Sequence, residues 1–145
     1  MTSKETPNPP NRVSLRWTGM GMEYVGSGTR GPDVLLDGRS EKGPGPMDTL
    51  LLALAGCMAV DVQVVLEGSR VPLERLEVDV EGERASTHPR RYERIRLTYR
   101  VQGPMEEHQD KVHRAISMSR ERLCSVLHSL RPDIDVEVEI HRMEA

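Results

Sequence analysis

Hydrophobic and polar residues alternate with a period of two in several parts of the chain, a pattern typical of β-strands with one buried face. The predicted strands are residues 13–17, 22–26, 34–37, 73–83, 92–101 and 134–140. Gly19-Met20-Gly21 is a turn signal between the first two, and a charged loop containing Pro89 separates the fourth from the fifth. We therefore expect antiparallel hairpins in both halves of the chain.

A long apolar segment between the two groups of strands predicts a helix. Residues 47–67 are apolar on nearly every side, which is typical of a helix buried all round. Pro46 suits its first turn, Asp48 places a carboxylate near its N-terminus, and Gly68 ends it. A domain of this size has little room to bury such a helix by itself, so the pattern also indicates an intimate homodimer.

Two further segments, residues 105–119 and 120–130, carry apolar residues at helical spacing. Pro104 precedes the first of them and Pro132 stops the second. The order of strands, helix, strands, helices and strand predicts an α+β fold, with antiparallel sheets packed around the long buried helix.

Composition indicates an ordinary globular chain. Of its 145 residues, 37% are hydrophobic and 30% are charged, and the net charge of −3 argues against a nucleic-acid partner. Residues 1–12 are polar and Pro-rich, which predicts a flexible tail rather than a signal peptide, and residues 13–145 form the single expected domain. The apolar run 50–60 is too short to span a membrane. We expect a cytoplasmic protein without a membrane partner.

The chain contains two cysteines, Cys57 and Cys124. A structural disulfide is not expected in a reducing cytoplasm. Two cysteines cannot make a closed four-ligand zinc site, and histidine does not stand at ligand spacing beside them, so no metal is expected. Two interpretations remain: the cysteines are small buried apolar residues, or they are a redox pair.

Cys57 lies near the middle of the long helix. Gly56 beside it costs roughly 1 kcal/mol relative to alanine inside a helix, which indicates that something packs close to the backbone there. Asp61 follows four residues later and shares a helix face with Cys57. A buried carboxylate would raise the pKa of a nearby thiol, so we assign Asp61 a structural role.

Cys124 follows a break between two predicted helices, which places it near a helix N-terminus. That position lowers the pKa of a thiol, and so would the neighbouring Arg120 and Arg122. The plainer interpretation of both arginines is a solvated helix face. His128, one turn later, either assists the thiol or is a partly exposed helical histidine.

Two segments resemble the OsmC/Ohr family. Residues 45–62, GPMDTLLLALAGCMAVDV, resemble the helix that marks this family, and residues 123–126, LCSV, resemble its second cysteine segment. The resemblance implies an OsmC-like α+β fold in an intertwined homodimer, with the central helices buried between subunits. It also implies a peroxidase for organic hydroperoxides, or for hydrogen peroxide, that serves in defence against oxidative stress.

In the cycle that the resemblance implies, Cys57 attacks the peroxide and becomes a sulfenic acid. Cys124 then resolves this species as a disulfide, and a lipoyl-type dithiol restores both thiols. This chemistry needs no metal and no organic cofactor.

The chain departs from the best-characterised branch of this family, in which an Arg–Glu pair activates the first cysteine. Met47 stands at the Glu position, ten residues before Cys57, and Met20 occupies the hairpin turn that would hold the Arg. The sequence is closer to the branch of YhfA-like proteins. Arg39 is a candidate for the missing positive charge, with Arg30 a weaker one.

The remaining candidates each have a plainer interpretation. Asp48 would support the site or act only on the helix N-terminus. Met20, Met47 and Met58 would line an apolar substrate pocket or simply fill the core. An exposed surface residue is the plainer interpretation of Arg39.

Two other functions fit the same residues. The protein could be a non-enzymatic dimer that binds a small apolar or thiol-bearing ligand at the interface, or a structural protein with two inert cysteines. A fast reaction of Cys57 with peroxide separates the first hypothesis from these two.

Overall fold

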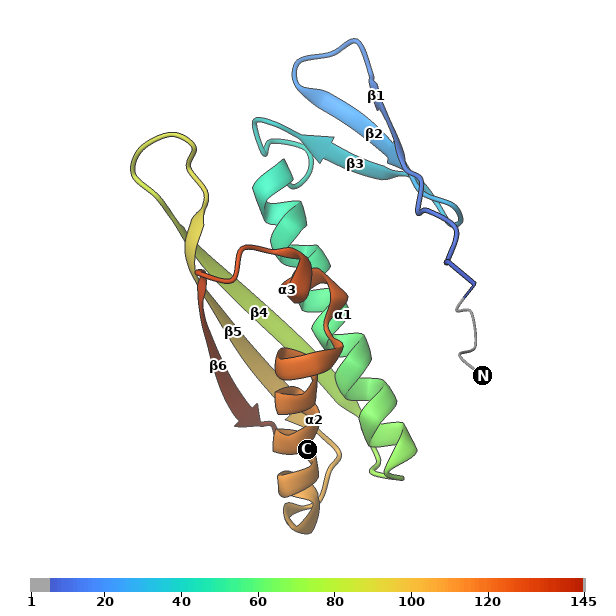
Figure 1. Ribbon diagram of the computed structural model, residues 1–145, viewed down its shortest axis with the longest axis vertical. Helices are drawn as coiled ribbons and strands as arrows, with labels where there is room; N and C mark the ends of the chain where they lie inside the picture. The colour runs from blue at the N-terminus through green and yellow to red at the C-terminus, as the bar shows by residue number, and fades with distance from the viewer. Residues whose placement is uncertain (1–5, 145) are drawn as a thin grey trace. The chain divides into compact units, whose positions relative to one another are not determined.

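The computed structural model describes residues 6–144 and divides into two compact units, one up to Thr49 and one from Leu50 onward (Figure 1). Residues 6–12 are exposed and form neither helix nor strand. The rest of the predicted tail, residues 1–5, lies outside the described residues. Both cysteines belong to the second unit, so this unit contains the candidate site.

The first unit is an antiparallel sheet in the order β1-β2-β3. Its strands are β1 (Ser14–Trp17), β2 (Glu23–Ser27) and β3 (Val34–Asp37). The turn between β1 and β2 holds Gly19 at φ 90° and Gly21 at φ 48°, a left-handed conformation that favours glycine. The predicted hairpin and the short third strand are confirmed.

Asp37 organises the loop that follows β3. Its carboxylate accepts hydrogen bonds from the backbone N–H groups of Arg39 at 2.9 Å, Glu41 at 3.2 Å and Lys42 at 3.0 Å. These donors, first among them Arg39, hold the pKa of Asp37 below its ordinary value. The carboxylate therefore fixes the course of the loop that leads into the long helix.

The second unit contains a sheet in the order β4-β5-β6. As predicted, β4 (Arg75–Arg84) and β5 (Tyr92–Gln102) pair antiparallel. The expectation of antiparallel sheets is wrong for β6 (Asp135–Arg142), which pairs with β5 in parallel, Arg94 opposite Asp135. The helices between β5 and β6 carry the chain back to the start of β5, the crossover that a parallel pair requires.

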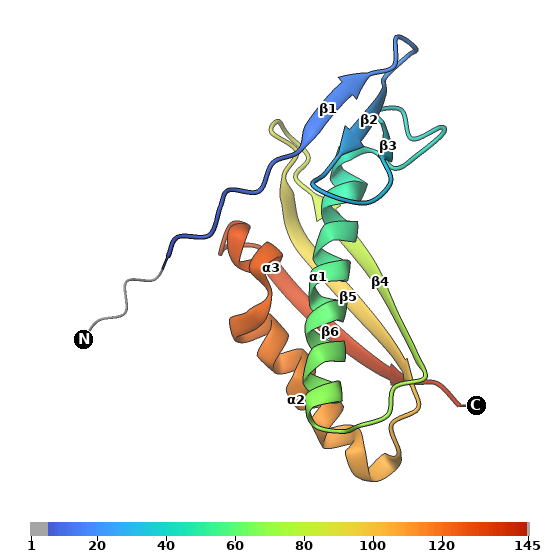
Figure 2. The ribbon, with the colours of Figure 1, turned by 90° about the vertical axis from the view of Figure 1, so that its right-hand side faces the viewer.

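The helices are α1 (Pro46–Gly68), the 3₁₀ turn η1 (Glu106–His108), α2 (Gln109–Met118), the π-helical turn η2 (Ser119–Leu123) and α3 (Ser125–Ser129). The second of the two predicted short helices is thus split by Cys124 into a π-helical turn and a five-residue helix. From Leu50 on, α1 lies beside α2, and both cover the same face of the β4-β5-β6 sheet (Figures 1 and 2).

The core of the second unit lies between these helices and the sheet. Alternate residues of the central strand β5 are buried, together with one face of α2; the buried set is Ile95, Leu97, Tyr99, Val101, Val112, Ala115 and Ile116. The ring of Tyr92 occupies the space that a side chain at position 82 would need, which explains the glycine in β4.

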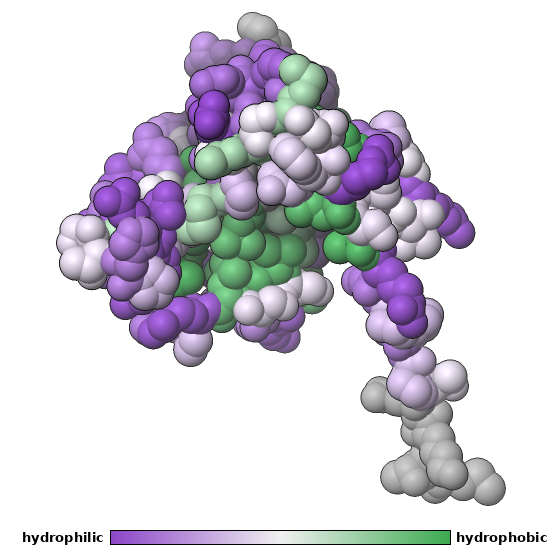
Figure 3. Space-filling view, turned by 90° about the horizontal axis from the view of Figure 1, so that it is seen from above, coloured by the Kyte–Doolittle hydropathy of each residue, from purple (hydrophilic) through white to green (hydrophobic). Residues whose placement is uncertain are grey.

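In the single chain α1 is buried along one side only, and the predicted all-round burial requires a second copy of the chain. One stripe is fully buried, Leu54, Met58, Val62 and Leu66, but Leu52, Val60 and Val64 are 60%, 59% and 60% exposed. Hydrophobic residues, green in Figure 3, accordingly reach the surface. Nor does Gly56 have a close neighbour among the described residues: a Cβ there would meet open space.

By length and composition alone, α1 is also apolar enough to cross a membrane, with a mean hydropathy of 2.1 over 18 residues. The apolar run 50–60 ends before Asp61, so the prediction from that run did not include the rest of the helix. The core helix of a globular protein passes the same test, and the buried stripe of α1 packs within its own unit.

Candidate redox site

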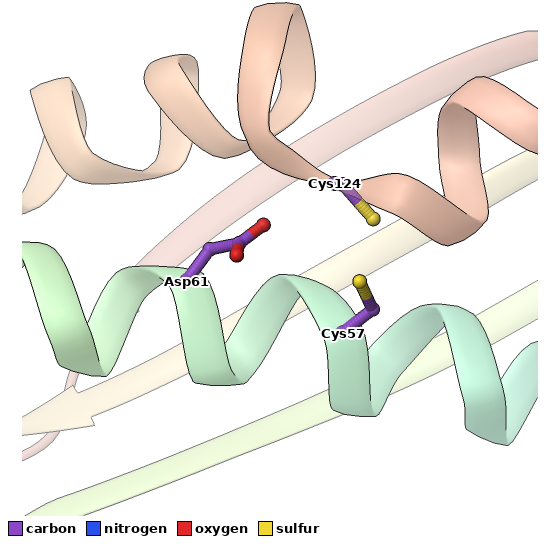
Figure 4. A group of neighbouring side chains, drawn as sticks. All are labelled: Cys57, Asp61 and Cys124. Atoms are coloured by element: carbon purple, nitrogen blue, oxygen red, sulfur yellow. The ribbon is translucent and has the colours of Figure 1, made fainter. Parts of the chain in front are cut away.

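The two cysteines come from different helices of the second unit. Cys57 is half-buried in the middle of α1, whereas Cys124 is fully buried and is the N-cap residue of α3. Both are free thiols, and their sulfur atoms point toward one another (Figure 4). The structure therefore brings together the two residues that the sequence singled out as a redox pair.

The π-helical turn explains how Cys124 reaches this position. The Cys124 N–H donates to the carbonyl of Ser119 at 2.9 Å, which closes the wide turn of η2. Ser119 and Cys124 are buried at its two ends, while residues 120–123 between them are exposed. An α-helical repeat would not bring residues five apart to the same side, so this one turn aims both side chains at α1.

Asp61 completes the cluster. One of its carboxylate oxygens and the sulfur atoms of Cys57 and Cys124 all lie within 4.8 Å of one another (Figure 4). The buried Ser119 hydroxyl donates to Asp61 Oδ2 at 2.8 Å and fixes the carboxylate. A structural role was predicted for Asp61, but its carboxylate lies within 4.8 Å of both sulfur atoms.

Burial has the largest effect on the pKa of the Cys124 thiol. It raises the pKa of Cys124 from an ordinary value of 9.0 to about 11, with smaller contributions in the same direction from Cys57 and Asp61. The N–H of Leu127 donates to the sulfur at 3.3 Å and lowers the pKa, as a helix N-terminus should, but burial outweighs it. The sequence-based prediction of a lowered pKa is therefore wrong.

Arg120 and His128, which are close to Cys124 in the sequence, are directed at backbone carbonyls. Arg120 is exposed and donates to the carbonyl of Val136 at 2.7 Å, and Arg122 is exposed as well. The ring nitrogens of His128 lie 2.8 Å from the Cys124 carbonyl and 3.0 Å from the Glu121 carbonyl. His128 thus connects the π-helical turn to α3 instead of assisting the thiol.

Tyr99 is a residue of the site that sequence reasoning missed. It is fully buried on β5, and its hydroxyl has no hydrogen-bond partner within the described part of the chain. Burial raises the pKa of Tyr99, and so do the nearby Cys124 and Asp61. The strand pattern showed that Tyr99 faces the core, but not that it lies near Cys124 and Asp61.

Of the remaining candidates, only Met58 lies next to this cluster in the sequence. In the first unit, Arg39 is exposed and its charge acts on Asp37, Asp48 is exposed in the first turn of α1, and Met47 is half-buried. Met20 is 60% exposed in the hairpin turn, so it does not fill a core there. In the second unit, Met58 is fully buried in the core stripe of α1.

Comparison with known protein families finds a match over the part of the chain that contains this cluster. The family model described as OsmC-like protein matches residues 38–139, which include both cysteines and Asp61. The chain belongs to the OsmC-like family. The resemblance that the sequence suggested is confirmed, and so is the α+β fold; the homodimer remains a prediction.

Individual relatives cover most of this OsmC-like chain. Protein YhfA of Escherichia coli strain K12 is 33% identical over 126 residues, or 86% of this chain and 92% of YhfA. A hypothetical protein of Aquifex aeolicus VF5 is similar in structure, with a TM-score of 0.81, 24% identity and coverage of 94% and 98%. An organic hydroperoxide resistance protein OsmC of Legionella pneumophila has a TM-score of 0.68, 15% identity and coverage of 94% and 99%.

Proposed function

We propose that this OsmC-like protein is a thiol-dependent peroxidase that reduces organic hydroperoxides through Cys57 and Cys124. The observation that carries the proposal is the pair of free sulfur atoms that face each other within 4.8 Å, one half-buried and the other fully buried. The fold is shared with a protein named for organic hydroperoxide resistance, which supports the same substrate class.

The first step belongs to Cys57, because its side chain is the more accessible. Its thiolate attacks the distal oxygen of the hydroperoxide, the O–O bond breaks, and the alcohol leaves after taking up a proton. Cys57 is then a sulfenic acid and has been oxidised by two electrons. Hydrogen peroxide would react in the same way and release water.

Cys124 performs the second step. Its sulfur attacks the Cys57 sulfur, a disulfide forms, and water leaves with the sulfenic hydroxyl and the thiol proton. With a pKa of about 11, Cys124 needs its proton removed for this attack. The Asp61 carboxylate, one oxygen of which lies within 4.8 Å of the sulfur, is the proposed base. The sulfur atoms must approach to about 2.05 Å, and the junction of η2 and α3 is the place to accommodate this shift.

The cycle closes when a dithiol reduces the disulfide and becomes a disulfide itself. A lipoyl-type dithiol is our proposed reductant, and the cytoplasm is the proposed compartment. Arg39 and Asp48 stay the sequence-based candidates for supporting the Cys57 thiolate, and Met20, Met47 and Met58 stay those for binding an apolar substrate.

A homodimer is part of the proposal. The exposed apolar face of α1 has Gly56 at its centre, flanked by Leu52, Val60 and Val64. A glycine with open space beside it allows the backbone of a second helix to approach closely. A second copy of the chain would bury this face and satisfy the all-round apolar pattern of α1.

The test is to count thiols in reduced protein before and after one equivalent of cumene hydroperoxide. We expect rapid loss of both thiols, and a sulfenic acid that can be trapped only in Cys124→Ser. Cys57→Ser is the matched control and should keep its remaining thiol. If both wild-type thiols survive the peroxide, the peroxidase proposal fails and a ligand-binding dimer becomes the better explanation.

A further inference from the structure

We propose that Cys57, Cys124 and Asp61 form a binding site for a thiophilic divalent cation, of which Zn²⁺ is the prototype. The site would be open, with three protein ligands and a fourth position for water or a small anion. The inference stands on the geometry of the cluster and does not depend on peroxidase activity.

The ligand atoms match the preferences of zinc. Thiolates and a carboxylate are ligands that Zn²⁺ accepts, at about 2.3 Å for sulfur and about 2.0–2.2 Å for oxygen. A tetrahedral ion then places its ligand atoms about 3.5–3.8 Å from one another. The three atoms here all lie within 4.8 Å of one another, so a contraction of about 1 Å would suffice. Mg²⁺ and Ca²⁺ prefer oxygen ligands and do not suit two sulfur atoms.

The surroundings hold two of the ligands in place. Ser119 donates to one oxygen of Asp61 at 2.8 Å, and the Leu127 N–H donates to the Cys124 sulfur at 3.3 Å. Hydrogen bonds of this kind orient ligands in metal sites, and an N–H group directed at sulfur stabilises a metal-bound thiolate.

Tyr99 gives an independent indication of a ligand. Its hydroxyl is fully buried and lacks a partner among residues 6–144, although a buried hydroxyl is costly to leave unbonded. It lies close enough to Cys124 and Asp61 to feel both charges. A water or anion in the fourth metal position would be a hydrogen-bond acceptor for this phenol.

Charge favours a cation in the same place. Among the groups near the sulfur atoms are a carboxylate, a phenol and two thiols, whereas Arg120 and His128 are directed at backbone carbonyls. Zn²⁺ is bound by sulfur as thiolate, so ligation by both cysteines would release to solvent the protons that the thiols carry. A coordinating thiol is deprotonated by the ion itself, so burial of Cys124 does not prevent ligation.

The test uses reduced full-length protein titrated with ZnCl₂ in two buffers of different ionisation enthalpy. We expect one ion per chain and proton release on binding. Co²⁺ alone should give a near-ultraviolet sulfur-to-cobalt charge-transfer band. Asp61→Ala should weaken Zn²⁺ binding by more than tenfold, and Tyr99→Phe by about tenfold.

Glu67→Ala is the matched control, an exposed carboxylate on the same helix, and should bind as the wild type does. Asp61→Asn keeps an acceptor for Ser119, so it tests ligation if Asp61→Ala does not fold. Absence of binding by the wild type, or equal binding by Asp61→Asn and wild type, would overturn the site. Equal binding by Cys57→Ser would place the ion elsewhere and overturn it too. No readout requires turnover of peroxide, so this result is separate from the proposed activity.

Discussion

Two opposing effects act on the pKa of the Cys124 thiol. A hydrogen bond from the Leu127 N–H favours the thiolate, but α3 is only five residues long and complete burial favours the neutral thiol. Cys57 is half-buried on a continuous helix, so the two thiols of this pair meet different surroundings. The contrast fits the proposed roles of Cys57 as the accessible nucleophile and Cys124 as the shielded resolving cysteine.

The raised pKa of Cys124 predicts a pH profile. In Cys57→Ser, alkylation of Cys124 by iodoacetamide should accelerate about tenfold per pH unit and level off only near pH 11, because thiolate is scarce below that. In urea the same thiol should level off near its ordinary value of 9.0. The stability contributed by the neutral buried thiol is fully present below pH 9 and is lost as pH rises toward 11. A plateau below pH 9 in the folded variant would contradict the assignment.

At the scale of elements, the pairing of β4 with β5 depends on a glycine. Gly82 leaves room for the ring of the buried Tyr92, and the register of the two strands shifts just beyond it, between Glu83 and Arg84. The shift lets Tyr92 turn its ring over β4, at the end of the strand nearest the charged loop.

Gly82→Ala should therefore destabilise the second unit. A Cβ at this position collides with the Tyr92 ring, and overpacking of this kind costs about 1–3 kcal/mol. Urea unfolding followed by far-ultraviolet circular dichroism measures the change. Gly28→Ala is the control, since nothing lies within 4 Å of a Cβ there. Equal stability of the two variants would show that Tyr92 moves aside at no cost.

Much of this element order could be predicted from periodicity. The alternating strands and the apolar α1 follow from spacing alone, and Asp61 was correctly placed on the face of Cys57. The alternation of apolar and polar residues does not show in which direction a strand runs, however, so the parallel pairing of β6 was not predicted. The sequence of the π-helical turn has the pattern of an ordinary helix, so the position of Cys124 next to α1 could not be predicted from it. Tyr99 lies near the site only because of tertiary packing, which cannot be predicted from a local sequence pattern.

On the scale of the whole molecule, the exposed face of α1 is the feature that a single chain leaves incomplete. Leu52, Val60 and Val64 repeat every turn or two along one side of the helix and are more than half exposed. Apolar exposure in such a stripe indicates an interaction surface rather than scattered surface residues.

Val60→Lys should convert the proposed dimer to a monomer. Val60 is exposed in the single chain, so lysine costs little there, whereas a charge buried between two copies of α1 is strongly unfavourable. Sedimentation velocity measures the change in mass. His113→Lys, an exposed position on α2, should leave the wild-type mass unchanged. A monomeric wild type, or a Val60→Lys protein that stays dimeric, would refute the interface.

The parallel position of β6 has a consequence for biosynthesis. β5 ends at Gln102 and β6 begins at Asp135, so the sheet cannot be completed until the helices between them have been synthesised. Until then one edge of β5 is open, and an open edge is a template for aggregation. Arg94 and Arg96, which bind Asp135 and Glu137 once β6 arrives, place positive charge along that edge meanwhile. The nascent chain is thus protected by the side chains that later bind β6.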